Sequence, residues 1–338
     1  MHSQNCFIIA EIGQAHEGSL GMAHSYIDAV ADTGVDAIKF QTHIAEAESS
    51  EYEPFRVKFS YEDESRYDYW KRMEFSLEQW RGIKKHCDDV GIEFMSSPFS
   101  NMAVDLLEDV GVNKYKIGSG EVNNFLILEK IAKTGKEIIL SSGMSSFDDL
   151  DQSIKFLKKF GNSISILQCT TKYPTSEIDI GLNILHELKE RYDGLKIGLS
   201  DHSGTIYPSL AAISLGAKIL EFHVTFDKNM FGPDSRSSLT LKEVGQLVEG
   251  VRFIEKSINH KVDKRDNSQF YELKNIFEKS LALNQSMNKG DIIKFEDLEA
   301  KKPSGHGIAA KEYQEIIGKK LTRNINKWCF LTKEDVSE

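Results

Sequence analysis

Two histidines, each at the end of an apolar run, have the spacing that most plainly suggests chemistry in this 338-residue chain. Residues 197–202 read IGLSDH and residues 220–223 read LEFH, so the runs end in His202 and His223. Neutral imidazole is a good ligand for Mn²⁺, Zn²⁺ or Fe²⁺. If the runs are neighbouring strands, the two rings supply part of a metal site with open positions. A lone histidine is more often structural, so it is the pairing that favours a metal.

Two lysines, Lys39 and Lys116, lie within other apolar runs, where an unpaired charge is costly to bury. Internal pairing with Glu11, Glu121 or Glu221 is one explanation. The alternative is that both lysines hold an anion together with serine hydroxyls, and a phosphate suits such a ring of donors. The serines in comparable positions are Ser97, Ser119, Ser141 and Ser200.

Other polar residues near the ends of these runs are ambiguous. Asp234, in the sequence FGPD, suits a third metal ligand, an acceptor for a sugar hydroxyl or a turn residue. His16, His43 and His306 are each explained equally well as hydrogen-bonded loop histidines.

Strands and helices alternate strictly along the chain, and this order predicts the elements that position these side chains. Alternation implies a parallel sheet, and eight units within residues 1–258 predict a (β/α)8 barrel. An open doubly wound sheet is the alternative, weakened because no G-x-G-x-x-G follows the first strand. The predicted strands are 7–10, 36–42, 92–99, 114–121, 137–144, 164–170, 195–202 and 219–225. In this fold the chemistry lies at the carboxyl ends of the strands.

Three further segments complete the organisation of the chain. Residues 43–72 form a long insertion whose aromatic content, including Phe59, favours an ordered loop. Residues 259–276 are polar and predict a linker. Residues 277–338 predict a small domain of short strands, with the loop KPSGHG at 302–307.

The composition is that of a globular protein without a large basic surface. A net charge of −10 argues against nucleic-acid binding, and no apolar run is long enough for a membrane span. Four cysteines without a close pair indicate free thiols in a reducing compartment. The first six residues lack a signal-peptide pattern, so we expect a cytoplasmic location.

The motifs taken together resemble the sialic acid synthase family, which ends in an antifreeze-like (SAF) domain. The motifs are EIGQAHEGS (11–19), KFQTH (39–43), SSPFS (96–100), YKIGSGEVNN (115–124), LSSGM (140–144), QCTTKYP (168–174), IGLSDHS (197–203), LEFHVT (220–225) and GPDSRSSL (232–239). The resemblance implies condensation of phosphoenolpyruvate with N-acetylmannosamine or a related N-acylated amino sugar. The expected products are N-acetylneuraminate, or a related nonulosonic acid such as legionaminate or pseudaminate, and phosphate.

The resemblance also implies roles for individual residues. His202 and His223 match metal ligands, with Mn²⁺ expected and Mg²⁺ or Co²⁺ as alternatives. Glu121 matches a carboxylate that handles protons at the reacting centre, and Glu11, Lys39 and Lys116 complete the expected catalytic group. Positions matching a phosphoenolpyruvate site are Lys39, Ser97, Lys116, Ser119, Ser141, Tyr173 and Ser200. Positions matching an amino-sugar site are Glu11, Gln41, Asp234 and Lys302.

The sequence departs from the family pattern at three positions. Ala15 stands where an asparagine is common, and Gln14 is a candidate to replace its amide. Thr171 replaces another asparagine, and Lys302 stands where relatives have an arginine that contacts the N-acyl group. The resemblance further implies a domain-swapped homodimer. Two other functions fit less well: a phosphoenolpyruvate aldol synthase acting on a phosphorylated aldose, and a non-catalytic carbohydrate-binding protein.

Overall fold

The computed structural model describes residues 5–57 and 61–337. Phe59 and the first four residues, on which part of the signal-peptide prediction rests, lie outside these ranges. The chain divides into two compact units; the first ends at His260 and the second begins at Lys261. Among the described residues, no helix is both long enough and apolar enough to cross a membrane.

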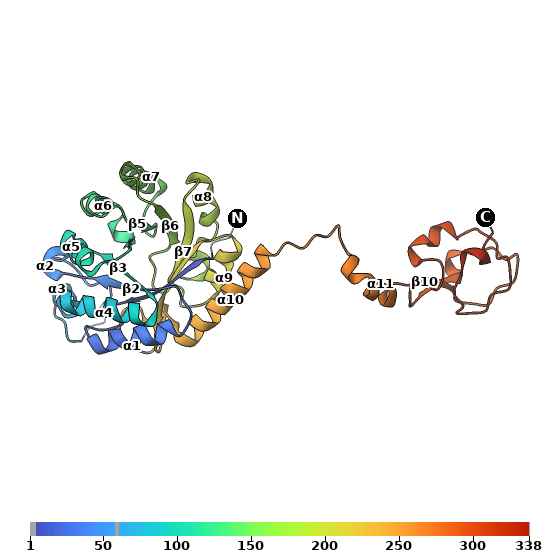
Figure 1. The fold of residues 1–338 in the computed structure, drawn as a ribbon, viewed down its shortest axis with the longest axis horizontal. Coiled ribbons are helices and arrows are strands. Elements are labelled where there is room, and N and C mark those ends of the chain that lie inside the picture. Colours follow the sequence, from blue (N-terminus) through green and yellow to red (C-terminus); the bar gives the residue numbers. More distant parts are fainter. Residues whose placement is uncertain (1–4, 58–60, 338) are drawn as a thin grey trace. The chain divides into compact units, whose positions relative to one another are not determined.

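The first unit contains a closed barrel of eight parallel strands, as predicted, and not an open sheet (Figure 1). Closure is made by β1, which pairs with β2 on one side and with β8 on the other. A short strand, β9 (Leu239–Thr240), extends from β8. The barrel strands are β1 (Phe7–Gly13), β2 (Ala37–Thr42), β3 (Glu93–Pro98), β4 (Lys114–Ile117), β5 (Glu137–Ser141), β6 (Ile164–Cys169), β7 (Lys196–Asp201) and β8 (Ile219–Thr225).

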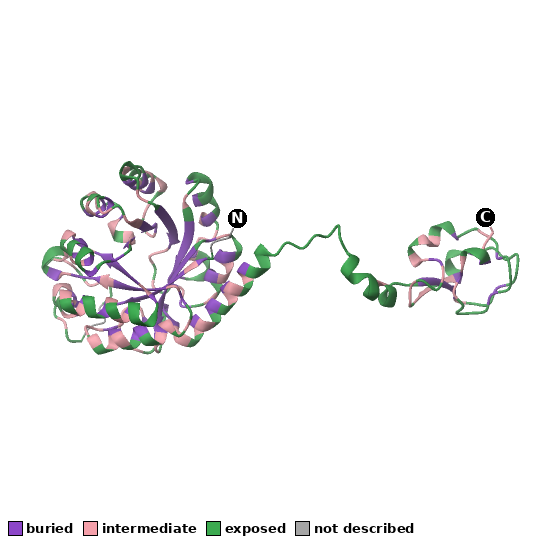
Figure 2. Ribbon diagram, in the orientation of Figure 1, coloured by how far each residue is buried: buried purple, intermediate pink, exposed green. Residues whose placement is uncertain are grey.

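In the described part of the chain, helices surround the barrel and each buries one face (Figure 2). In α4, Ser76 and Gln79 form a capping box at the start, the apolar side chains follow at helical spacing, and Gly91 ends the helix with φ of 80°. The surrounding helices are α1 (Leu20–Ala31), α4 (Leu77–Val90), α5 (Asn101–Val110), α6 (Phe125–Ala132), α7 (Phe147–Leu157), α8 (Ile184–Arg191), α9 (Tyr207–Ser214) and α10 (Leu241–Asn259).

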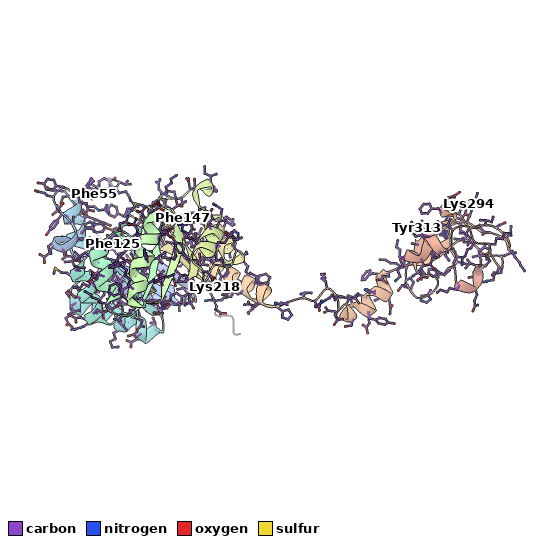
Figure 3. The ribbon with its side chains drawn as sticks, turned by 90° about the horizontal axis from the view of Figure 1, so that it is seen from above. Phe55, Phe125, Phe147, Lys218, Lys294 and Tyr313 are labelled. Carbon is purple, nitrogen blue, oxygen red and sulfur yellow. The ribbon has the colours of Figure 1, made fainter. Side chains whose placement is uncertain are left out.

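The strand repeat of two residues sorts the barrel interior into layers. One layer is apolar and fully buried, and it consists of Ile9, Ala37, Met95, Ile139, Leu167 and Ile219. Two residues further along each of these strands lies a second inward layer, which is mainly polar or charged: Glu11, Lys39, Ser97, Ser141, Cys169 and Glu221. The apolar layer therefore closes the barrel beneath a polar layer at the carboxyl ends of the strands. Figure 3 labels Phe55 in the connection after β2, Phe125 and Phe147 at the starts of α6 and α7, and Lys218 directly before β8.

The predicted and observed segments differ in detail. The predicted strand 114–121 ends at Ile117, because the chain turns at Gly118 and residues Ser119–Glu121 form a 3-10 turn. The insertion 43–72 is folded where it is described, with α2 (Ala45–Glu48) and α3 (Arg66–Met73).

The second unit is a small domain with its own apolar core. It contains α11 (Tyr271–Phe277) and the antiparallel strands β10 (Ser280–Leu283) and β11 (Leu298–Lys301). Most of α11 lies within residues 259–276, which were predicted as a linker; its side chains are largely exposed, including the apolar Leu273 and Ile276. The core side chains are Leu281, Leu283, Met287, Ile293, Ile308, Ile316, Leu321, Ile325 and Leu331.

The close approach of β7 and β8 depends on Gly198, and this gives a stability prediction. A Cβ at this position would overlap the carbonyl oxygen of Ile219 and lie 2.6 Å from a methyl of Leu167. We expect Gly198→Ala to lower the free energy of unfolding by about 3 kcal/mol in urea titrations. Gly82→Ala is the matched control, because no heavy atom lies within 4 Å of its Cβ position in α4. It should stabilise by about 0.5–1 kcal/mol; equal effects of the two changes would contradict the prediction.

Candidate active site

Lys39 lies in a buried ion network at the carboxyl end of the barrel. Its ammonium group contacts the carboxylate of Glu11 and lies 3.7 Å from an oxygen of Glu221. It also donates a 3.2 Å hydrogen bond to Ser97 Oγ. Burial opposes the charge on Lys39, but the two carboxylates outweigh it and raise its pKa. Lys39 is therefore a full positive charge held away from bulk water.

Glu221 connects this network to the second lysine. The ammonium group of Lys116 lies 3.5 Å from Glu221 Oε1 and donates a 2.6 Å hydrogen bond to Ser141 Oγ. Burial lowers the pKa of Lys116. Burial alone would raise the pKa of Glu221, but Lys116 and Lys39 hold it at about 2. Ser200 donates a 2.9 Å hydrogen bond to the same carboxylate. Internal pairing, one of the two explanations open from the sequence, is thus present through Glu11 and Glu221.

A small polar cradle surrounds the bare backbone of Gly143. A Cβ built there would overlap the hydroxyl oxygens of Ser119 and Thr171 and would lie 3.0 Å from the sulfur of Cys169. The hydroxyl oxygen of Thr171 is buried and makes no hydrogen bond within the described ranges. An unsatisfied buried hydroxyl is costly, and a ligand oxygen in the cradle would satisfy it. These features suit the phosphate that the sequence predicts.

The rings of His202 and His223 lie together, with centroids 5.3 Å apart. His202 Nδ1 is 3.1 Å from the carbonyl oxygen of Thr170 and donates to it, so Nε2 carries the lone pair, 3.2 Å from the Tyr173 hydroxyl. Burial, aided by His223, lowers the pKa of His202 to about 3. His202 is therefore neutral at physiological pH, as a metal ligand must be.

The two histidines fit an exchangeable metal ion better than a closed structural site. Across the part of the chain that is described, no group of three or more His, Cys, Asp and Glu residues could hold a metal. Asp234 instead accepts a 2.9 Å hydrogen bond from Arg56, so it is not a third ligand in this structure. Two imidazoles leave several coordination positions for water or substrate oxygens.

A cavity of about 480 Å³ opens beside these groups. Glu121 lies on its wall, is half-buried, and accepts a 2.7 Å hydrogen bond from Asn124. Burial raises the pKa of Glu121. Gln41, which donates to Glu11 at 3.1 Å, joins the cavity wall to the ion network. Other lining residues are Gln14, His43, Ser119, Thr171, Tyr173, His223 and Asp234.

Two other histidines of the first unit have different roles, one at the cavity and one in the core. The ring of His43 is stacked between those of Trp70 and Phe99, with centroid distances of 3.8 Å and 4.5 Å. Its Nδ1 lies 2.7 Å from Glu48 Oε1. It belongs to the cavity wall. His16 is buried against aromatic side chains, and burial lowers its pKa to about 3. His16 therefore has a structural role.

Lys302 lies in the second unit, where its ammonium group is 4.7 Å from the ring centre of Phe277. The first unit alone contains the cavity and the other predicted site residues. The proposed contact of Lys302 with the sugar stays a prediction.

Sequence reasoning missed several residues of the cavity. Arg56 and Arg66 lie on its wall. They could have been suspected because they are basic residues within the aromatic segment 43–72. Gly143 was visible as the glycine of the motif LSSGM. Its role depends on Ser119, which follows β4, and on Cys169 and Thr171 at the end of β6, and no local pattern reveals these neighbours.

Gly143→Ala should weaken phosphoenolpyruvate binding because the added methyl group occupies the cradle. We expect the Kd, measured by calorimetry, to rise about 100-fold, equivalent to about 2.7 kcal/mol. Gly245→Ala is the control, since no heavy atom lies within 4 Å of its Cβ position. If Gly143→Ala binds phosphoenolpyruvate unchanged and has a native circular dichroism spectrum, the assignment of the anion to this cradle is wrong.

His202→Ala should abolish Mn²⁺ binding, measured by electron paramagnetic resonance of free Mn²⁺, and reduce metal-dependent activity at least about 100-fold. His186→Ala is the control, because that side chain is 77% exposed and pairs only with Glu190 among the described residues. Full metal binding and activity in His202→Ala would remove the metal assignment.

Comparison with known proteins places these residues in a family. Residues 26–263 match the NeuB family and residues 278–337 match the SAF domain. The chain is 37% identical to N,N'-diacetyllegionaminic acid synthase of Campylobacter jejuni, with 94% of this chain and 96% of the relative covered. It is 33% identical to human N-acetylneuraminate-9-phosphate synthase, with 94% and 88% covered.

A solved structure gives the same result. N-acetylneuraminic acid (sialic acid) synthetase from Leptospira borgpetersenii, in complex with citrate, is 32% identical and has a TM-score of 0.71. The match covers 80% of this chain and 91% of that one. The resemblance read from the nine sequence motifs is confirmed: this chain belongs to the NeuB family and ends in a SAF domain.

Proposed function

We propose that this chain is a nonulosonic acid synthase. It condenses phosphoenolpyruvate with N-acetylmannosamine or a related N-acylated amino sugar and releases phosphate. The observation that carries the proposal is the convergence of two buried lysines, a hydroxyl cradle and a pair of histidines beside one cavity. The names of the relatives support it, since they are synthases of sialic and legionaminic acids.

The anionic substrate is assigned to the barrel interior. Lys39 and Lys116 would face its negative charges, with hydroxyls from Ser119 and Thr171 around the phosphate. Because Lys116 has a lowered pKa, a bound anion would also stabilise its charged form. The two cations are fixed before the substrate arrives, so they need little reorganisation as charge develops on the departing phosphate.

The divalent ion, expected to be Mn²⁺, would be held by His202 and His223. When bound, it supplies Lewis acidity toward the aldehyde oxygen of the open-chain sugar. The neutral state of His202, which its burial enforces, keeps a nitrogen lone pair available. Tyr173 lies 3.2 Å from that nitrogen and would have to give way or share it.

The carbon–carbon bond forms between C3 of phosphoenolpyruvate and the aldehyde carbon of the sugar. Water then adds to C2, and the tetrahedral intermediate expels phosphate through cleavage of the C–O bond. We assign Glu121, on the cavity wall, as the base that accepts the proton lost by this water. Its pKa is raised by burial toward neutral pH. A group whose pKa is near the working pH can both accept and return a proton.

Legionaminate or pseudaminate synthesis is the second candidate within the same reaction class. Legionaminate is favoured by the 37% identity to the legionaminic acid synthase of Campylobacter jejuni, which is higher than the 33% identity to the human enzyme. A non-catalytic carbohydrate-binding protein is disfavoured, because binding alone would not need the buried lysines. The domain-swapped homodimer and the cytoplasmic location stay predictions from the sequence.

A panel of sugars tests the proposal. With phosphoenolpyruvate and Mn²⁺, we expect phosphate release only when an N-acylated amino sugar is added, at least about 100-fold above the rate without sugar. The panel contains N-acetylmannosamine and the diacetamido precursors of legionaminate and pseudaminate, with arabinose 5-phosphate as the phosphorylated alternative. Turnover with the phosphorylated pentose and none of the amino sugars would overturn the proposal. Removing the metal with a chelator should abolish the activity, and adding Mn²⁺ should restore it.

A further inference from the structure

A second cavity lies at the amino end of the barrel, opposite the candidate active site. Its volume is about 610 Å³, and its described lining comes mainly from the starts of strands. In this fold the chemistry lies at the carboxyl end, so a ligand bound here would be outside the candidate active site. The charged and aromatic lining residues are Phe7 on β1, Lys114 on β4, Glu137 on β5, Lys196 on β7 and Lys218 directly before β8.

The floor of this cavity is apolar. Ile139 and Ile219 line it and belong to the apolar layer that closes the barrel, where they are 1% and 2% exposed. Phe7 packs against the same layer and also lines the cavity. Ser141 and Glu221 follow two residues later on the same strands, on the other side of the layer. The layer therefore separates the second cavity from the candidate active site.

Positive charge is in excess around the cavity. Lys114, Lys196 and Lys218 line it, against the single carboxylate of Glu137. Glu137 lies 3.9 Å from the ammonium group of Lys114 and 3.6 Å from that of Lys196, which is too far for a hydrogen bond. Lys114 instead donates a 3.1 Å hydrogen bond to Glu93. Within the described ranges, the ammonium group of Lys218 has no ion pair. The donors of Lys196 and Lys218 are thus available to a ligand.

The backbone that carries these two lysines is fixed. The N–H of Lys218 donates to the carbonyl oxygen of Ile197 at 2.8 Å, and its own carbonyl oxygen accepts from the N–H of Phe7 at 2.9 Å. Lys196 lies within β7, opposite Ser165 on β6. Both side chains are open to solvent, since that of Lys196 is 48% exposed and Lys218 is exposed. A ligand would have to order only the side chains, which keeps the entropic cost of binding low.

We propose that this cavity is a second ligand site and that it binds a small organic phosphate. Lys196 and Lys218 hold the phosphate group, because lysine ammonium groups are compact point charges that suit phosphate oxygens. The organic part of the ligand lies on Phe7, Ile139 and Ile219 and removes their apolar surface from water. The site is separate from that of the proposed synthase and does not rest on the proposed function.

Phenyl phosphate is the probe, because it carries a phosphate group on an apolar ring. Calorimetry is done with the full chain at pH 8, where a phosphate monoester carries roughly two negative charges. We expect its Kd to be at least about tenfold lower than that of inorganic phosphate, which lacks the ring, or of benzyl alcohol, which lacks the charge. Equal binding of benzyl alcohol would overturn the phosphate assignment. Equal binding of inorganic phosphate would overturn the role of the apolar floor.

Two substitutions should change the affinity for phenyl phosphate in opposite directions. Lys218→Ala removes a cation, and we expect the Kd to rise about tenfold. Glu137→Gln removes the carboxylate that repels the ligand and attracts Lys196, so the Kd should fall about threefold. A gain in affinity cannot come from a damaged fold. Lys155→Ala is the matched control, because Lys155 is exposed on α7 and absent from the cavity. Weaker binding by Glu137→Gln, or equal effects of Lys218→Ala and Lys155→Ala, would overturn the site.

Gly143→Ala separates the two ends of the barrel, because the cradle at Gly143 is the other place where a phosphate can bind. The two ends share no contacts, so we expect this variant to leave the amino-end Kd for phenyl phosphate within about twofold. Turnover by Lys218→Ala should likewise stay within about twofold of the unmodified protein, which shows that the fold is intact. If Gly143→Ala weakens binding of the probe and Lys218→Ala does not, the phosphate binds only at the carboxyl end and the second site is overturned.

Discussion

The pairing of Glu221 with Lys39 and Lys116 is the interaction on which this structure depends. Removing ions from water costs several kcal/mol each, and mutual attraction offsets that cost only with good geometry. The geometry here comes from strand register: Glu11 on β1 lies opposite Lys39 on β2, and Ser200 on β7 lies opposite Glu221 on β8. The charges can be buried only because β1 also pairs with β8 and closes the barrel.

This constraint explains the layered chemistry of the site. The charges of two lysines and two carboxylates cancel above the apolar layer, so the barrel interior carries no large net charge. The cradle around Gly143 and the two histidines lie at the ends of barrel strands or directly after them. Low exposure keeps the imidazole of His202 neutral while the lysines stay near carboxylates. One property, burial at the carboxyl end of a closed barrel, therefore sets both the charge of Lys39 and the neutrality of His202.

The sequence could predict what depends on local period and order. Alternating strands and helices predicted the barrel, and lysines within apolar runs predicted charges inside it. Which carboxylates pair with them could not be predicted, because Glu11, Glu121 and Glu221 were equivalent in sequence. The choice follows from closure, which places Glu11 and Glu221 inside and leaves Glu121 on a 3-10 turn at the cavity wall. The wall at Arg66 was hidden for another reason: segment 43–72 has no regular period, so its contacts arise only in three dimensions.

The strands and the connections constrain substitution differently. Removing one member of a buried ion pair leaves an uncompensated charge and costs about 3–5 kcal/mol, so the network can change little without loss of the fold. The wall at Arg66 and Trp70 instead rests on a separate small cluster that includes Ala45, Tyr69 and Met73. That cluster is not part of the main barrel core, so its side chains can change without disturbing the buried charges. The connection after β2 can therefore vary in sequence while the strands keep the same buried charges.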